Sequence, residues 1–185
     1  MAPGEEPRTV QEALFSPDRL LTLRTRVSAA YKGLYILLLK EGAIDWRTGD
    51  AVTAITYFED AIDIHHIFPR SWCQKSDIDP KTYNSIINKT PLSARTNRVI
   101  GGWAPSDYRS RLANSAGVDR KTIDKHVGPH CIDTARLWSD DFDGFVRARQ
   151  RALLNLVASA MGKPVASEVT SVGAESFDVD DAIGA

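Results

Sequence analysis

The chain has 185 residues, of which 43% are hydrophobic and 25% are charged, a composition typical of a soluble globular domain. Two cysteines are too few for a thiolate zinc ribbon or a secreted disulfide scaffold. No apolar run approaches the roughly 20 residues that a membrane-spanning helix needs. The first residues, Met-Ala-Pro-Gly-Glu-Glu-Pro, lack the basic and apolar regions of a signal peptide, so we expect a cytoplasmic protein with no membrane partner.

The net charge of −1 is the sum of two opposed segments. Residues 65–111 include eight basic and three acidic side chains, which gives this segment a charge of +5. After Lys163 there is no further Lys or Arg, and five acidic residues follow. The total charge alone would argue against a nucleic-acid partner, but the basic segment favours contact with a phosphate backbone.

We expect one folded domain over residues 16–163. Residues 1–15 and residues 164–185 lack sustained apolar periodicity, which predicts a flexible N-terminal segment and a flexible acidic tail. The length of the central part allows a hydrophobic core that needs no disulfide or structural metal.

Two long helices are predicted near the ends of this domain. Apolar residues spaced by three and four predict a helix that begins near Ser16 and ends near Gly42. The same spacing predicts a second helix that begins after Ser139 and ends at Gly162. The basic segment would lie between them.

Shorter elements are predicted between the two helices. β-Branched and alternating residues indicate strands at 51–57, 61–65 and 89–94. The proline- and serine-containing residues 68–85 indicate a long loop, and Pro105 begins a further helix. The predicted order is strand, loop, strand, helix.

The most informative stretch is residues 63–71, Asp-Ile-His-His-Ile-Phe-Pro-Arg-Ser, with Asn88 and Asn97 downstream. This pattern resembles the HNH, or ββα-metal, nuclease family. The resemblance implies an α+β fold with a small ββα-metal core at about residues 57–115, packed between flanking α-helices.

The resemblance also implies roles for individual residues. His66 matches the general base, and a histidine with an ordinary pKa near 6.5 can accept a proton from water at neutral pH. His65 and Asn97 match the ligands of one divalent metal ion, with Mg²⁺ expected first and Mn²⁺, Ni²⁺ or Zn²⁺ as alternatives. Asn88 matches the residue that braces the histidine loop, and Asp63 is a candidate carboxylate beside the ligands.

Two further expectations concern this site. Adjacent residues of a regular strand face opposite sides, so the strand must distort or end for His65 and His66 to reach one phosphate. Four basic side chains near the motif are candidates to bind DNA phosphates, a contact that carries affinity without sequence information. They are Arg70, Lys89, Arg95 and Arg98.

The resemblance extends over about residues 20–163. Residues 24–39, 42–49, 65–72 and 141–150 look like the C-terminal nuclease half of GmrSD-type restriction proteins, in which a ParB-like NTPase domain senses foreign DNA. This implies a DNA endonuclease that leaves 5′-phosphate and 3′-hydroxyl ends and restricts foreign or phage DNA. The NTPase or sensor partner is not in this chain, and the sequence leaves the oligomeric state open.

Two other functions remain open. The fold could be a non-catalytic module that binds DNA or a protein partner. It could also be a zinc-stabilised interaction domain, although Gly128-Pro129 interrupts any helical pairing of its histidines. The zinc candidates are His126, His130, Cys73 and Cys131. The tryptophans, predicted as core or loop-packing residues rather than base-stacking platforms, are Trp46, Trp72, Trp103 and Trp138.

Overall fold

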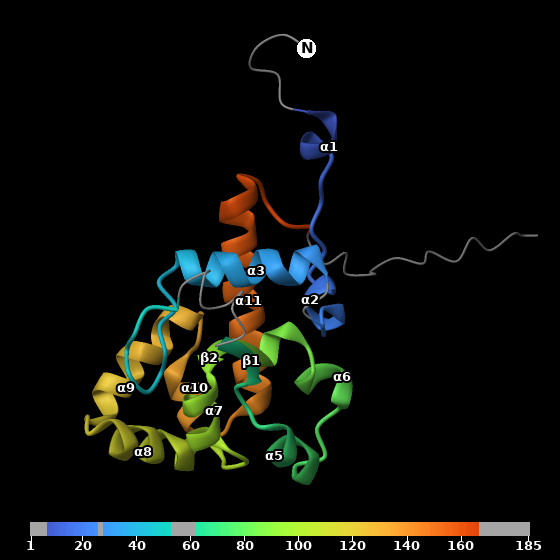
Figure 1. Ribbon diagram of the computed structural model, residues 1–185. Coiled ribbons are helices and arrows are strands. Elements are labelled where there is room, and N and C mark those ends of the chain that lie inside the picture. The colour runs from blue at the N-terminus through green and yellow to red at the C-terminus, as the bar shows by residue number, and fades with distance from the viewer. Residues whose placement is uncertain (1–6, 26–27, 53–61, 167–185) are drawn as a thin grey trace, which may run out of the picture.

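The computed structural model describes residues 7–25, 28–52 and 62–166, in which helices surround one two-stranded sheet (Figure 1). The α-helices are α1 (Arg8–Gln11), α2 (Arg19–Thr22), α3 (Ala29–Lys40), α5 (Arg70–Lys75), α6 (Pro80–Tyr83), α7 (Ala94–Ile100), α8 (Pro105–Ala116), α9 (Arg120–Val127), α10 (Thr134–Trp138) and α11 (Phe142–Met161). Two short 3-10 helices are η1 (Ile86–Asn88) and η2 (Gly128–His130). The combination of helices with a small sheet confirms the expected α+β class.

The sheet consists of β1 (Ile62–His66) and β2 (Lys89–Ser93). The strands pair antiparallel, with the first residue of β1 opposite the last of β2 and His66 opposite Lys89. The strand predicted at 61–65 is thus confirmed over its described residues, and the strand predicted at 89–94 is confirmed up to Ser93, because Ala94 begins α7. Most of the strand predicted at 51–57 lies outside the described residues.

The single helix predicted from Ser16 to Gly42 is wrong, because the chain forms α2 and α3 with a break between them. Leu23 is extended, and its carbonyl accepts a hydrogen bond from the backbone N–H of Ile86 rather than from the next helical turn. Ser28 caps α3 by accepting from the N–H of Tyr31. A tertiary hydrogen bond and a local cap therefore override the apolar periodicity.

The long loop predicted at 68–85 is also wrong, because α5 and α6 lie within it. Pro69 is the extended residue immediately before α5. Asp79 accepts from the N–H of Lys81 at the start of α6, where Pro80 takes the first helical position. The residues that indicated a loop are here helix-start residues, which have the same composition as turns.

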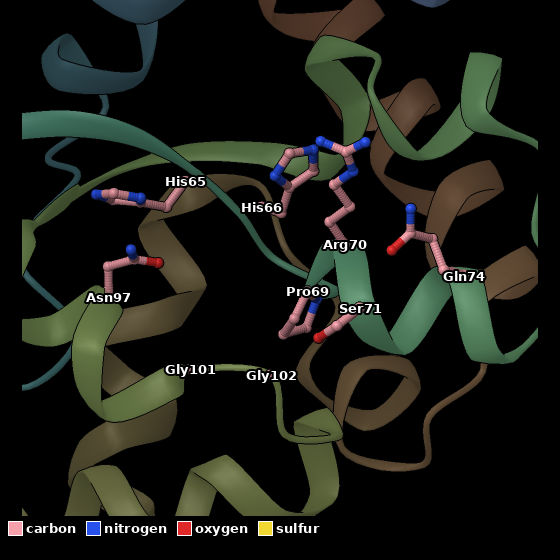
Figure 2. Close-up of a pocket in the computed structure, with 9 residues that line it drawn as sticks. All are labelled: His65, His66, Pro69, Arg70, Ser71, Gln74, Asn97, Gly101 and Gly102. Carbon is pink, nitrogen blue, oxygen red and sulfur yellow. The ribbon is translucent and has the colours of Figure 1, made fainter.

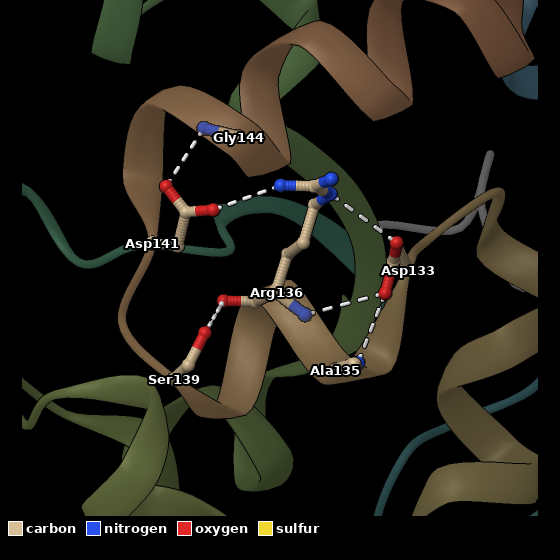
Figure 3. Close-up of polar contacts among 6 residues, drawn as sticks. All are labelled: Asp133, Ala135, Arg136, Ser139, Asp141 and Gly144. Atoms are coloured by element: carbon tan, nitrogen blue, oxygen red, sulfur yellow. Dashed lines mark hydrogen bonds and ion pairs between the residues drawn. The ribbon is translucent and has the colours of Figure 1, made fainter.

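The predicted C-terminal helix is confirmed as α11, and Gly162 ends it in the left-handed conformation. Asp141, rather than Ser139, caps its first turn by accepting from the N–H of Gly144 (Figure 3). The second oxygen of Asp141 accepts from Arg136 of α10, which also pairs with Asp133. These contacts fix the angle between α10 and α11. The helix predicted at Pro105 is confirmed as α8.

Two apolar clusters hold these elements together. The first lies around Phe68 and Tyr108, below the sheet, and includes the buried Trp46. The second joins α2 and α3 to η1 and the later turns of α11, which passes behind α3 in Figure 1. Trp72 and Trp138 pack against the first cluster, as predicted. Trp103 is 48% exposed and lies outside both clusters, and its ring stacks with Arg111.

One charged side chain is buried where α11 meets η1. Arg149 is fully buried, and its Nη1 donates to the carbonyl oxygen of Ile87 at 2.6 Å. Burial lowers the pKa of this guanidinium to about 10, although the neighbouring Cys131, Tyr35 and Tyr31 act in the opposite direction. Arg149 therefore ties the C-terminal helix to the residue that immediately precedes Asn88.

The ends of the described chain also meet. Lys163 donates through Nζ to the carbonyls of Val10 and Gln11, and the N–H of Ala166 donates to the carbonyl of Phe15. The segment 1–15, expected to be flexible throughout, thus contains the short helix α1. No helix of the described part is long and apolar enough to span a bilayer.

Candidate functional site

His65 and His66 lie at the end of β1 and both line one pocket, with a volume of about 410 Å³. Both residues are paired with β2, His65 with Thr90 and His66 with Lys89, so the expected break of the strand between them is not found, and both line the pocket from the last two positions of β1. The lining residues are His65, His66, Pro69, Arg70, Ser71, Gln74, Asn97, Gly101 and Gly102 (Figure 2). They come from β1, α5, α7 and the turn after α7. The pocket thus joins segments more than 30 residues apart.

Asn97 reaches the pocket because α7 begins directly after β2. Ser93, the last residue of β2, caps α7 by accepting from the N–H of Thr96. Figure 2 shows the side chain of Asn97 on the same side of the pocket as the ring of His65. The antiparallel pairing of β1 with β2 thereby brings the two predicted metal ligands together.

A buried carboxylate anchors this start of α7. Asp45 accepts from Thr96 Oγ1 at 2.6 Å and from the N–H of Ser93 at 3.0 Å. Burial alone would raise the pKa of Asp45, but these hydrogen bonds and one from Thr48 outweigh it, so the pKa lies below its ordinary value. Asp45 is therefore a charged group that fixes the position from which Asn97 extends.

His66 is oriented by Asn84, which follows α6. The two side chains meet at 3.1 Å between His66 Nε2 and Asn84 Oδ1. Because an amide oxygen only accepts hydrogen bonds, Nε2 carries the proton and Nδ1 retains its lone pair. Burial lowers the pKa of His66; the contact with Asn84 opposes this shift, and the charges of Lys89 and Arg70 add to it. The imidazole is therefore neutral at pH 7, with Nδ1 as the basic atom.

Asn88 holds the turn that follows His66. This fully buried side chain accepts from the N–H of Phe68 at 2.8 Å and donates to the carbonyls of Phe68 and Tyr83, each at 3.0 Å. Its backbone carbonyl accepts from the N–H of Ile67. Asn88 thus connects the residues after β1 with α6 and with the start of β2.

The four predicted phosphate-binding residues lie at different distances from the pocket. Arg70 lines it and is exposed. Lys89 is opposite His66 in the sheet, but its Nζ donates to the carbonyl of Arg24 and its pKa is lowered by burial and by the charge of Arg24. Arg95 and Arg98 are exposed on α7 and do not line the pocket. The structure therefore brings only Arg70 into the pocket.

The side chain of Asp63 lies outside the described part of the structure, although its backbone pairs with Leu92 in the sheet. Its suggested place beside the ligands stays a prediction.

The pair formed by His65 and Asn97 offers one imidazole nitrogen and one amide oxygen. Such a pair fits a cation that keeps most of its water and phosphate ligands, as Mg²⁺ does at phosphate sites.

Three of the four residues considered for a zinc centre have other hydrogen-bond partners. His130 is fully buried, with Nδ1 2.6 Å from Thr90 Oγ1 and Nε2 2.8 Å from the carbonyl of Ile44. His126 Nδ1 contacts the carbonyl of Trp46. The Cys73 thiol donates to the carbonyl of Phe68, and burial raises its pKa to about 12. Among the described residues, no three His, Cys, Asp or Glu side chains gather as a metal centre would require.

Sequence reasoning missed Asn84 and Asp45, and of the pocket residues on α5 it missed Ser71 and Gln74. Asn84 carries no motif signal, because its role depends on α6, which was predicted as loop. Asp45 lies in a turn that the sequence identified without assigning a function to its carboxylate. Gln74, four positions after Arg70, could have been found from this spacing once a helix was recognised there, whereas Ser71, one position after Arg70, could not.

Comparison with known proteins gives one distant relative. The chain is 32% identical over 97 residues to a protein of Methanocaldococcus jannaschii that is named only as uncharacterized. The match covers 52% of this chain and 16% of that protein. No protein-family profile and no solved structure matches the chain. The chain thus spans about a sixth of the length of the relative it matches.

Proposed function

We propose that the protein is a metal-dependent DNA endonuclease of the HNH type. The observation that carries this proposal is the meeting of His65, His66 and Asn97 in one open pocket, at the end of an antiparallel strand pair that is followed by a helix. The order of two strands and a helix and the spacing of these three residues both resemble the HNH pattern. A binding module would not need a histidine in this pocket whose tautomer is set by a neighbouring amide.

In this proposal His66 is the general base. Asn84 holds the proton on Nε2, so Nδ1 accepts the proton of the attacking water. The depressed pKa keeps this nitrogen unprotonated at neutral pH. Asn88 keeps the imidazole in place by clamping the turn directly after it.

The other pocket residues bind and orient the phosphodiester. His65 and Asn97 would hold one divalent ion, which supplies a positive charge to the phosphate and the departing 3′-oxygen. Arg70 lies on the facing wall, where its guanidinium can hold a phosphate oxygen with two N–H donors. The products would be a 5′-phosphate and a 3′-hydroxyl.

We further propose that the domain is the effector of a larger system that restricts foreign or phage DNA, with a separate NTPase sensor. The relative in Methanocaldococcus jannaschii supports this idea, since the matched residues form only 16% of that protein. A small cleavage domain of this kind would work beside other domains in cytoplasm.

Nicking of supercoiled plasmid tests the proposal. We expect cleavage with Mg²⁺ or Mn²⁺ and its loss with a chelator, and we expect His66→Ala to lower the rate at least about 100-fold, the usual contribution of a general base. His126→Gln is the matched control, because this half-buried histidine lies outside the pocket. Equal rates for the wild type and His66→Ala would refute the proposed base. DNA binding without any cleavage would instead support the non-catalytic module.

A further inference from the structure

Trp103 is exposed at the edge of the candidate active site. It directly follows Gly102, which lines the pocket, so the two Cα atoms are about 3.8 Å apart. Gly102 is fixed against α5, because a Cβ atom there would lie 2.5 Å from Ser71 Oγ. An indole that is 48% exposed on a short turn beside a polar pocket does not contribute to either core cluster.

The indole is held in a defined position although it is exposed. The guanidinium carbon of Arg111, on α8, lies 4.1 Å from the ring centroid of Trp103. Gly101 adopts a positive φ of 54°, and a Cβ atom there would lie 3.5 Å from Trp103 Cδ1. The N–H of Trp103 also donates to the carbonyl of Ile100. The ring is thus preorganised by its neighbours rather than by burial.

A second Arg–Trp pair shows what a structural stack looks like in the same protein. Arg109 lies 5.3 Å from the ring of Trp138, but this indole donates through Nε1 to Asp124, and Arg109 pairs with the same carboxylate. Trp138 is also packed edge-on by Tyr108. Among the described residues Arg111 has no such acidic partner, so its charge remains available beside the exposed ring.

We propose that Trp103 and Arg111 form a stacking platform for one unpaired DNA base next to the cleaved phosphate. Aromatic side chains bind unstacked bases in a sequence-tolerant manner, and an adjacent arginine adds a cation–π contact and attracts the phosphate backbone. Arg70 in the pocket and Arg111 beside the ring carry positive charge that a nucleic acid would meet near Gly101 and Gly102. The inference rests on the proposed nuclease function and adds its substrate class: DNA with a base that has left the helical stack.

Binding measurements with His66→Ala protein in chelator test this platform without cleavage. The probe is a short single-stranded oligothymidylate, compared with a duplex of the same length. We expect Trp103→Ala and Trp103→Leu to weaken single-strand binding about tenfold, and Trp103→Phe to retain most of it. Duplex binding should change much less. Ile36→Ala removes an equally exposed apolar side chain on α3 and should leave both affinities unchanged.

Tryptophan fluorescence gives a second readout. We expect the oligothymidylate to quench the emission of the wild-type indoles and to lose most of this effect in Trp103→Phe, although that variant still binds. Unchanged single-strand affinity in Trp103→Ala together with unchanged quenching in Trp103→Phe would overturn the inference. If affinity and quenching are both unchanged but plasmid nicking still depends on His66, the platform is refuted and the nuclease proposal is not. Platform-dependent binding by a protein that never cleaves DNA would uphold the platform and refute the nuclease.

Discussion

The buried imidazole of His130 makes the stability of this protein depend on pH. Its Nε2 donates to the carbonyl of Ile44, and its Nδ1 accepts from the hydroxyl of Thr90, so the contact with Thr90 requires the neutral ring. Burial lowers the pKa of His130 to about 3; the hydrogen bond to Ile44 and the charge of Asp45 oppose the shift, and the charge of Arg149 adds to it.

The magnitude follows from proton linkage. The unfolded chain protonates His130 near pH 6.5, whereas the folded protein keeps it neutral down to about pH 3. Its stabilising contribution is therefore fully present above about pH 6.5 and is lost progressively as the pH falls toward 3. The free energy of unfolding falls by about 1.4 kcal/mol per pH unit in this window, to a total of about 5 kcal/mol. A loss of that size rivals the whole stability of many domains.

Urea unfolding followed by circular dichroism, at several pH values between about 6.5 and about 4.5, measures this slope. His130→Gln is the variant to compare, because its amide supplies an acceptor for Thr90 and a donor for Ile44 without titrating. We expect lower stability than the wild type at pH 7 but a shallower slope. The difference between the two slopes isolates His130, because contributions from His66 cancel. Parallel lines for the two proteins would refute the reasoning.

Three further substitutions test the contacts around the site. Asn84→Leu should lower the nicking rate at least about tenfold with little change in DNA affinity, because His66 loses the partner that fixes its tautomer; an equal loss of affinity would contradict this positioning role. Asn88→Ala should lower the free energy of unfolding by about 3 kcal/mol in urea titration, since three buried hydrogen bonds are lost, whereas the exposed Asn114→Ala should change it by less than about 0.5 kcal/mol. Gly144→Ala should lower the melting temperature, because its Cβ would overlap the Asp141 carboxylate and Arg136; an unchanged melting temperature would show that the cap can move aside.

The fold could be predicted where the signal was local. The antiparallel strands and α11 follow from alternation, helical periodicity and the glycine at position 162. The break at Leu23 could not be predicted, because its carbonyl is used by Ile86, more than 60 residues away. The helices α5 and α6 were missed for a different reason: prolines and aspartates begin helices as often as they form loops.

In the candidate site, too, some residues have a local sequence signal and others depend on contacts between distant segments. The resemblance to the HNH family grouped His65, His66 and Asn97, and all three line one pocket. Asn84 and Asp45 could not be found this way, since each acts on a pocket element that is distant in sequence. Lys89 and the exposed arginines of α7 were grouped by charge, but charge alone does not report the direction in which a side chain extends.

The hydrogen bond from Arg149 to Ile87 bears on when the pocket forms during synthesis. Every residue that lines the pocket has been made by the time the chain reaches Gly102. η1 includes Asn88, whose side chain holds the turn after His66. The contact between η1 and Arg149 of α11 can form only after some fifty more residues have been synthesised. We therefore expect a nascent chain to acquire its final pocket geometry only after most of the domain has left the ribosome. For the nuclease activity proposed above, this order would keep an incomplete site from acting on the DNA of the cell that makes it.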